Sequence, residues 1–191
     1  IIKLTPNIKQ QKMSFLKKRI LIIVTLLFIP LYIFSQTSVD YNKLEETIIN
    51  HKISEVERWK LIYNYINIAK KGQNDEAIIN SYKIASVYSI FPENLKYADS
   101  ALIISKKLNA PKFLAISYLN RGIISMDNSE YIKSLDDVLT AHKYALSSND
   151  HYYIFKSKYY IAQNKIYLGQ IKDANNILKE CVTFFKKNTK I

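Results

Sequence analysis

The sequence contains few glycine and proline residues. Its 191 residues include only 3 Gly and 4 Pro, well below the roughly 7% and 5% of average usage. A many-stranded sandwich or barrel needs such turn formers every 8–12 residues or so, and their scarcity therefore favours long helices. The three glycines, Gly72, Gly122 and Gly169, lie about 50 residues apart, which excludes a glycine-rich loop that cradles phosphate.

Cysteine and histidine are also scarce. A single thiol, Cys181, cannot form an intrachain disulfide or a multi-cysteine metal site. His51, His142 and His151 do not pair at metal-ligand spacing on one helix, and the motifs H-E-x-x-H and G-x-S-x-G do not occur. We therefore expect no metal, no cofactor and no enzymatic activity, and we expect Cys181 to pack in the core.

Acidic residues are outnumbered, 16 against 28 Lys and Arg, which gives a net charge of +12. Such an excess raises the question of nucleic-acid binding. However, residues 1–35 hold six basic and no acidic side chains, and the rest of the chain holds 22 basic against 16 acidic ones. Because half of the excess belongs to this first segment and the other lysines are scattered, we expect these residues not to bind nucleic acid.

The amino-terminal residues have the order of a secretory signal. The chain begins with Ile, and its first Met is Met13, so we interpret residues 1–12 as upstream readthrough. The basic cluster Lys17-Lys18-Arg19 then precedes an uncharged apolar stretch at 20–34. This layout is typical of a signal peptide.

The apolar stretch at 20–34 is short for a membrane span. Its 15 residues would span about 22 Å as a helix, against a hydrocarbon core of roughly 30 Å. We expect cleavage after Ser35, with an uncleaved inner-membrane anchor as the alternative. Both place residues 37–191 outside the cytoplasm, in the periplasm, because the basic cluster stays inside.

The carboxyl-terminal part of the chain contains an internal repeat. A shift of 40 aligns residues 109–148 with 149–188 without a gap, and most pairs keep the same chemical class. The pairs include Ser117 with Ser157, Gly122 with Ala162, Tyr131 with Ile171, Ser134 with Ala174, Val138 with Leu178, and Ala141 with Cys181. Within each unit, apolar residues recur at spacings of three and four, which predicts two amphipathic helices per unit.

Farther upstream the shift of 40 fails, but the helical rhythm continues. Ser54 has capping-box spacing, and Gly72 is predicted to end the helix that follows. The helices predicted in order cover 44–49, 54–71, 75–89, 97–108, 111–126 capped by Asn109, 131–146, the segment between Asp150 and Gly169, and 171–185, which makes seven or eight antiparallel helices. The expected organisation is 13–36 signal peptide or anchor, 37–72 amino-terminal helices, 73–108 a degenerate unit, 109–148 and 149–188 two full units, and 189–191 a tail.

These units resemble tetratricopeptide repeats. In that family a small residue lies in the first helix of each unit, an aromatic or apolar residue opens the second helix, and small residues follow within it. The positions that match this pattern are Gly122, Tyr131, Ser134 and Ala141 in one unit, and Ala162, Ile171, Ala174 and Cys181 in the next. The resemblance implies an all-α solenoid of antiparallel helix pairs, although the period of 40 exceeds the usual 34 or so.

A narrower resemblance covers roughly residues 37–190. The order of a secretion signal, a helix at 57–71, the block Tyr97-Ala98-Asp99-Ser100 and two long units is similar to the extracytoplasmic half of certain bacterial one-chain regulators. In these, a tetratricopeptide sensor precedes a membrane helix and either an AraC-type helix-turn-helix domain or a histidine kinase. The sequence ends at Ile191, and we expect the intact gene product to continue into such an output domain.

Tyrosine is abundant, with 15 residues, and it supplies rigid, amphipathic contact area. The alternative explanation of this abundance is an AT-rich coding sequence. If the solenoid has a binding groove, the first helices of successive units should line it. The candidate residues are Tyr82, Ser86, Asn120, Lys156, Tyr159, Tyr160 and Gln163.

The resulting hypothesis is a non-enzymatic solenoid that binds a peptide or protein outside the cytoplasm and relays occupancy to a cytoplasmic output domain. A free-standing secreted or periplasmic scaffold is the alternative. The sequence leaves open whether the chain forms a homodimer.

Overall fold

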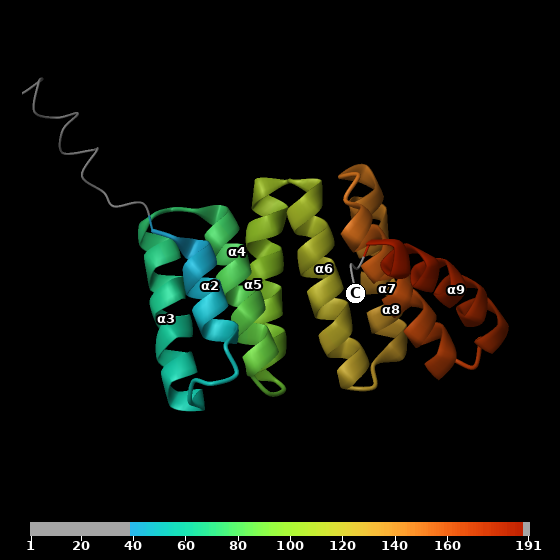
Figure 1. The fold of residues 1–191 in the computed structure, drawn as a ribbon, viewed down its shortest axis with the longest axis horizontal. Coiled ribbons are helices and arrows are strands. Elements are labelled where there is room, and N and C mark those ends of the chain that lie inside the picture. Colours follow the sequence, from blue (N-terminus) through green and yellow to red (C-terminus); the bar gives the residue numbers. More distant parts are fainter. Residues whose placement is uncertain (1–38, 189–191) are drawn as a thin grey trace, which may run out of the picture. The chain divides into compact units, whose positions relative to one another are not determined.

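The computed structural model describes residues 39–188. The predicted signal segment and the tail at 189–191 lie outside the described residues. The described part forms eight α-helices and contains no strand (Figure 1). The helices are α2 (Tyr41–Ile49), α3 (Glu55–Lys71), α4 (Asp75–Tyr88), α5 (Glu93–Leu108), α6 (Pro111–Asp127), α7 (Tyr131–Ser147), α8 (His151–Tyr167) and α9 (Ile171–Asn188).

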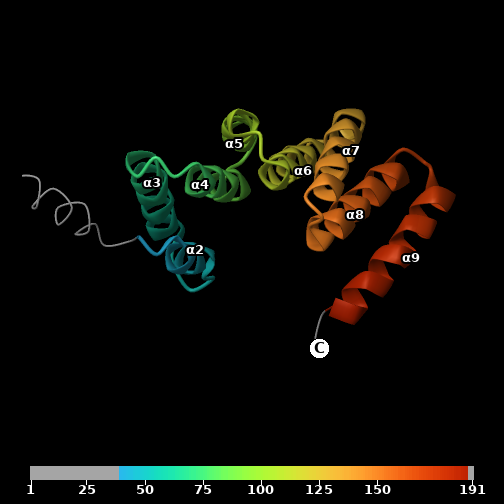
Figure 2. The ribbon, with the colours of Figure 1, turned by 90° about the horizontal axis from the view of Figure 1, so that it is seen from above.

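Each helix packs against the one before it and the one after it in the chain. In addition α4 contacts α6, and α6 contacts α8. Seen from above in Figure 2, α5 and α7 lie on one side of the array, and α4, α6 and α8 lie on the other. The all-α fold is therefore confirmed, and the arrangement is compatible with the predicted helical repeat.

The turns between helices recur at a regular interval. Asn109, Ser129, Asn149 and Gly169 have φ values of 51°, 63°, 53° and 78°, and their positions in the chain are equally spaced. A left-handed residue directly after a helix lets the backbone N–H groups close the last turn. Helices α6, α7 and α8 have 17 residues each and α9 has 18. Two of these intervals, each one helix and one turn, make up the 40-residue period of the sequence repeat.

Side-chain caps begin several of the helices. The Oγ of Ser54 accepts a hydrogen bond from the Glu57 N–H at 3.2 Å, and the Oδ1 of Asp150 accepts one from the Tyr153 N–H at 3.2 Å. Such caps satisfy amides that have no partner inside the helix. The predicted caps Ser54 and Asp150 are thus confirmed.

One predicted cap and two predicted helix starts are wrong, and the first of these starts is that of α2, which begins at Tyr41 and not at Leu44. Asn109 does not cap the helix at 111–127, because its left-handed conformation directs its N–H to the Ser105 carbonyl at 3.0 Å and so ends α5. The helix predicted from Tyr97 begins four residues earlier, at Glu93. A carboxylate in the first turn is favourable there because of the helix dipole.

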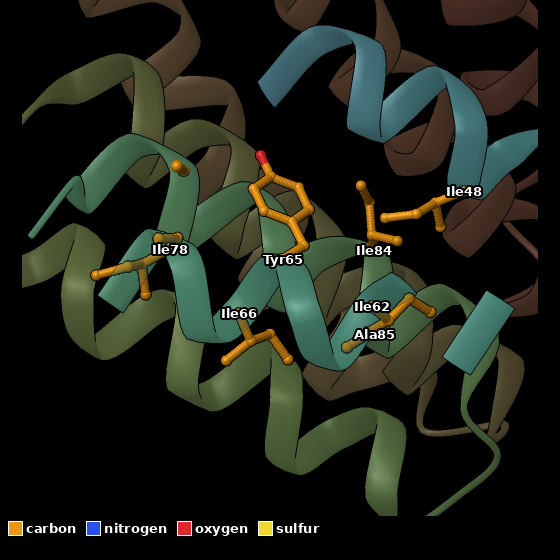
Figure 3. Packing of buried hydrophobic residues seen from close by; sticks show 9 residues of the cluster. Ile48, Ile62, Tyr65, Ile66, Ile78, Ile84 and Ala85 are labelled. Atoms are coloured by element: carbon orange, nitrogen blue, oxygen red, sulfur yellow. The ribbon is translucent and has the colours of Figure 1, made fainter. Parts of the chain in front are cut away.

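Buried side chains form separate clusters between adjacent helices. One unites Ile48 of α2, Ile62 and Tyr65 of α3 and Ile84 of α4, and Figure 3 shows Ile48 facing Ile84 beside the Tyr65 ring. Two smaller clusters join α6, α7 and α8. Their members are Leu119, Val138, Ala141 and Ile161 in one, and Ala115, Ala145 and Ile154 in the other. Full burial of one such large side chain stabilises a fold by about 1.5–3 kcal/mol.

Most of the residues predicted to define the repeat are buried. Gly122, Ser134, Ala141, Ala162, Ala174 and Cys181 lie in the interior, and Tyr131 is half-buried, stacked on Tyr167 with ring centroids 4.5 Å apart. Ile171 differs, because it is 49% exposed on the side of α9 that α8 does not cover. Of the two residues expected in the core of the second helices, Val138 is fully buried and Leu178 is half-buried.

Candidate binding surface

The predicted groove residues all lie on α4, α6 and α8. These three helices are neighbours in space although α5 and α7 separate them in the chain. We call the sides of these three helices that carry the predicted residues the α4–α6–α8 surface. The predicted residues are Tyr82 and Ser86 on α4, Asn120 on α6, and Lys156, Tyr159, Tyr160 and Gln163 on α8.

Ser86 and Asn120 are brought together and are nearly buried. The Nδ2 of Asn120 donates to the Oγ of Ser86 at 2.8 Å, and the Oγ of Ser86 donates to the Lys83 carbonyl at 2.7 Å. Ser86 is 2% exposed and Asn120 is 9% exposed. Because their polar groups satisfy each other, this pair holds α4 against α6 at the base of the surface.

Tyr82 does not join this pair. Its ring lies 6.2 Å from that of Tyr97 on α5, and the Nζ of Lys70 on α3 lies 5.3 Å from its centroid. Tyr97 in turn contacts Trp59 on α3, with ring centroids 6.3 Å apart. Tyr82 therefore belongs to an aromatic group that holds α3, α4 and α5 together.

On α8 the two aromatic candidates, Tyr159 and Tyr160, are in contact with each other. The rings of Tyr159 and Tyr160 meet edge to face at 5.2 Å, and the Nζ of Lys156 lies 5.4 Å from the ring of Tyr152. Tyr160 packs against the cluster around Leu119, and this burial raises the pKa of its hydroxyl, with smaller contributions from Tyr159, Asp127 and Tyr152. Tyr159 remains exposed, and Gln163 is half-buried.

Lys83 on α4 was not predicted but belongs to the same surface. Its ammonium is largely buried, and burial lowers its pKa; Lys156 on α8 lowers it further, whereas Glu45 on α2 raises it. Glu45 also contributes to the raised pKa of Tyr153, about 12, which is caused mainly by burial. Charged groups of α2, α4 and α8 thus influence one another across the surface. The sequence feature that could have identified Lys83 is its position three residues before Ser86, which places both residues on the same helix face.

A serine and a histidine meet between α7 and α8. The Nδ1 of His142 and the Oγ of Ser157 are 2.9 Å apart, and Ser157 also donates to the backbone carbonyls of Tyr153 and Ile154. Ser157 is buried inside the interface, where a substrate could not reach its hydroxyl. The hydrogen bond between His142 and Ser157 therefore connects α7 to α8.

Comparisons with known proteins give no match. No protein-family model, no curated protein and no solved structure matches the chain. Functional inference therefore depends on the side chains described above. Within residues 39–188, no three His, Cys, Asp or Glu side chains are grouped as metal ligands, and none of the helices there is long and apolar enough to cross a membrane.

Proposed function

We propose that the chain is a non-enzymatic protein-interaction module of the tetratricopeptide type that binds a peptide or a protein segment on the α4–α6–α8 surface. The observation that supports the proposal is that α4, α6 and α8, which come from successive helix pairs, are neighbours in space and carry Lys83, Lys156 and Tyr159. Tyrosines provide stacking area at low entropic cost, and lysines provide donors for backbone carbonyls and carboxylates. Such a surface suits an extended polypeptide.

We further propose that this module lies outside the cytoplasm and is the sensor part of a larger membrane-bound regulator. This proposal depends on the signal-like order of residues 13–36 and on the resemblance to extracytoplasmic sensor domains. For occupancy to carry a signal, the ligand must bind two arrangements of the helices with different affinity. A free-standing secreted or periplasmic scaffold is the alternative.

Selection from a random peptide library tests the binding proposal. We expect peptides that bind the protein to lose about tenfold or more in affinity on Lys156→Glu and on Tyr159→Ala, since a tenfold loss is about 1.4 kcal/mol. Lys143→Glu, an exposed site on α7, is the matched control for the charge change. Failure to select any peptide, or equal binding by all four proteins, would contradict the proposal.

The nucleotide sequence beyond codon 191 separates the sensor from the scaffold. An in-frame apolar stretch of about 20 residues followed by a helix-turn-helix or kinase domain supports the sensor. A stop codon at that point supports the scaffold.

A further inference from the structure

The last helix, α9, carries an apolar strip on a side that α8 does not cover. Ile171 and Val182 are 49% and 50% exposed, and Leu178 and Phe185 are half-buried. Spacings of three, four and seven place these four residues on one side of the helix. We call them the α9 strip. The strip adjoins Ala174 and Cys181, which are buried, and its exposed members Ile171 and Val182 lie farthest from these two residues around the helix.

The internal repeat shows what kind of element such a strip receives. One pair earlier, α7 has α6 on one side and α8 on the other, and buried residues of all three helices meet in two clusters. The shift that aligns the two units carries Tyr131, which stacks on Tyr167 of α8, to Ile171, and it carries His142, which lies 2.9 Å from Ser157 of α8, to Val182. The α9 strip is therefore the counterpart of the α7 face that the next helix covers, and a helix antiparallel to α9 fits it.

One position distinguishes this strip from its counterpart. The His142 of α7 offers its Nδ1 to the Ser157 hydroxyl of α8 at 2.9 Å, whereas the equivalent residue on α9 is Val182. A docked helix therefore meets an apolar side chain, which offers no hydrogen bond, at the position where α8 meets His142. The strip runs over about four turns, from Ile171 to Phe185, which at 1.5 Å per residue is about 21 Å.

A row of lysines flanks the strip on the side away from α8. Lys172, Lys179 and Lys186 recur every seven residues and are exposed. None of them forms an ion pair with another residue of 39–188. The two acidic residues of α9 are engaged with α8: Glu180 lies 2.6 Å from the Lys158 Nζ, and Asp173 lies 3.3 Å from the Lys165 Nζ. The lysine row is thus available to an outside anion.

This charge pattern opposes pairing of the strip with a second copy of itself. A two-fold contact brings the same patch from both chains together. Each copy would then present a lysine row, and its α9 has no unpaired carboxylate to set against it. A helix with Asp or Glu along one flank is complementary instead, in the way that charges beside an apolar seam select partners in coiled coils.

We propose that the α9 strip docks an amphipathic α-helix of a partner protein, with carboxylates along the flank that meets the lysine row. The docked helix runs antiparallel to α9 and covers the strip over about four turns. The apolar contact supplies most of the affinity, and the charges at its rim select the partner and speed association. This site is separate from the α4–α6–α8 surface.

Two synthetic helical peptides of about 18 residues test the proposal by fluorescence anisotropy with the purified chain. Both carry the same leucine strip, and their flanks carry Glu in one peptide and Lys in the other. We expect the Glu peptide to bind at least about tenfold more tightly. We expect Val182→Glu to abolish most of this binding and Lys179→Glu to reverse the preference between the peptides.

Leu139→Glu is the matched control, because Leu139 is 49% exposed on α7 and corresponds by the repeat to Lys179. We expect it to bind the Glu peptide as the unaltered chain does. Circular dichroism checks that each variant keeps its helices. Equal binding of both peptides, binding unaffected by Val182→Glu, or a dimer in sedimentation that Val182→Glu dissociates would each overturn the proposal; the last result would assign the strip to a second copy. The effect of Lys156→Glu on peptides selected from the library tests the α4–α6–α8 surface, and its result does not depend on any of these three outcomes.

Discussion

At the scale of single residues, Gly122 determines how closely α6 can approach α7. A Cβ at this position would lie 2.8 Å from the Cγ1 of Val138 and 3.2 Å from the Cβ of Asp137. Val138 is fully buried and β-branched, so it has little freedom to move. The position therefore requires glycine for close packing and not for an unusual backbone conformation.

We expect Gly122→Ala to destabilise the protein by about 1–2 kcal/mol. Overpacking costs about 1–3 kcal/mol, and the better helix propensity of alanine offsets up to about 1 kcal/mol of it. Urea unfolding followed by circular dichroism measures the change. The double variant Gly122→Ala/Val138→Ala should lose less than the sum of its single changes, because the clash is gone. Strict additivity would show that the two residues do not compete for space.

Arg121 connects three helices through two carboxylates of different exposure. Its Nε and Nη2 donate to the two oxygens of Asp137 at 2.8 and 2.6 Å, and its Nη1 lies 3.3 Å from Asp99. The side chain of Asp137 is 4% exposed and that of Asp99 is 48% exposed. The hydrogen bonds to Asp137 are the main reason that the pKa of Arg121 is raised.

We expect Asp137→Ala to lower the free energy of unfolding by about 3 kcal/mol, because it leaves a half-buried guanidinium without its bidentate partner. Asp99→Ala should cost less than about 1 kcal/mol, as is usual for exposed pairs. Chemical unfolding of both variants measures the difference. Equal losses would show that burial does not govern this network.

His142 makes stability depend on pH. Burial lowers the pKa of its imidazole below the ordinary value of about 6.5; the charge of Lys158 lowers it further, and a hydrogen bond with the Ile154 backbone opposes the shift. The folded protein therefore favours neutral His142. Its contribution to stability is complete above about pH 6.5 and is lost as the pH falls toward the folded-state pKa.

We expect urea midpoints to fall between about pH 7 and pH 5.5, and we expect the fall to be smaller in His142→Gln. Glutamine can keep a hydrogen bond to Ser157 without gaining a charge. His151→Gln, at an exposed position, serves as the control. An identical pH profile for His142→Gln and the unaltered chain would rule out this role.

At the scale of helices, α9 differs from the inner helices because α8 is its only large contact among the described elements. Its thiol, Cys181, is buried against α8, and its Sγ lies 3.6 Å from the Phe155 carbonyl. Burial is the main reason that the pKa of this thiol is raised. A thiol in this state reacts slowly, because the thiolate is the nucleophile.

We expect an aromatic disulfide reagent to label Cys181 at least about tenfold more slowly in the native protein than in denaturant, with a rate set by detachment of α9. A matched control places the thiol in solvent on the same helix: Thr183→Cys in a Cys181→Ala background should label quickly, since residue 183 is exposed. Equally fast labelling of both proteins would show that α9 does not protect the thiol.

Sequence periodicity predicted the helices well, because each inner helix has an apolar face that recurs every three or four residues. It was less accurate at the ends. Asn109 resembles a cap for the helix that follows it, yet only its backbone conformation, φ 51°, shows that it ends α5. Such a choice depends on how the two helices meet, which local sequence does not determine.

The candidate binding residues illustrate a second limit. Adjacent helical residues point about 100° apart, so the rotation of α4 decides whether Tyr82 or Lys83 faces the surface. That rotation follows from contacts with α3, α5 and α6, which come from distant parts of the sequence. The sequence therefore identified the correct helices for the surface but missed Lys83 and selected Tyr82, which packs toward α3 and α5.

At the scale of the whole molecule, the described helices interact mainly with their neighbours in the chain. In such an array stability is approximately a sum over units and over the interfaces between them. Helices α6 and α7 have partners on both sides, whereas α2 and α9 lie at the ends of the described array.

We expect amide hydrogen exchange to follow this order, with α6 and α7 exchanging most slowly and α2 and α9 most quickly. Mass spectrometry of peptic fragments measures it. Asp137→Ala should speed exchange throughout α6 and α7 and leave α2 and α3 nearly unchanged. Uniform protection from α2 to α9 would show a single cooperative unit instead.

The evenly spaced left-handed residues also limit how a gene for this protein can change length. Losing or gaining one codon inside a helix turns the side chains in the rest of that helix by about 100° about its axis, which moves buried residues into solvent. A duplication or loss of one complete two-helix unit leaves each remaining face in register. Within helices, viable changes of length should therefore come as whole hairpins, whereas short insertions should be confined to the turns at residues 109, 129, 149 and 169.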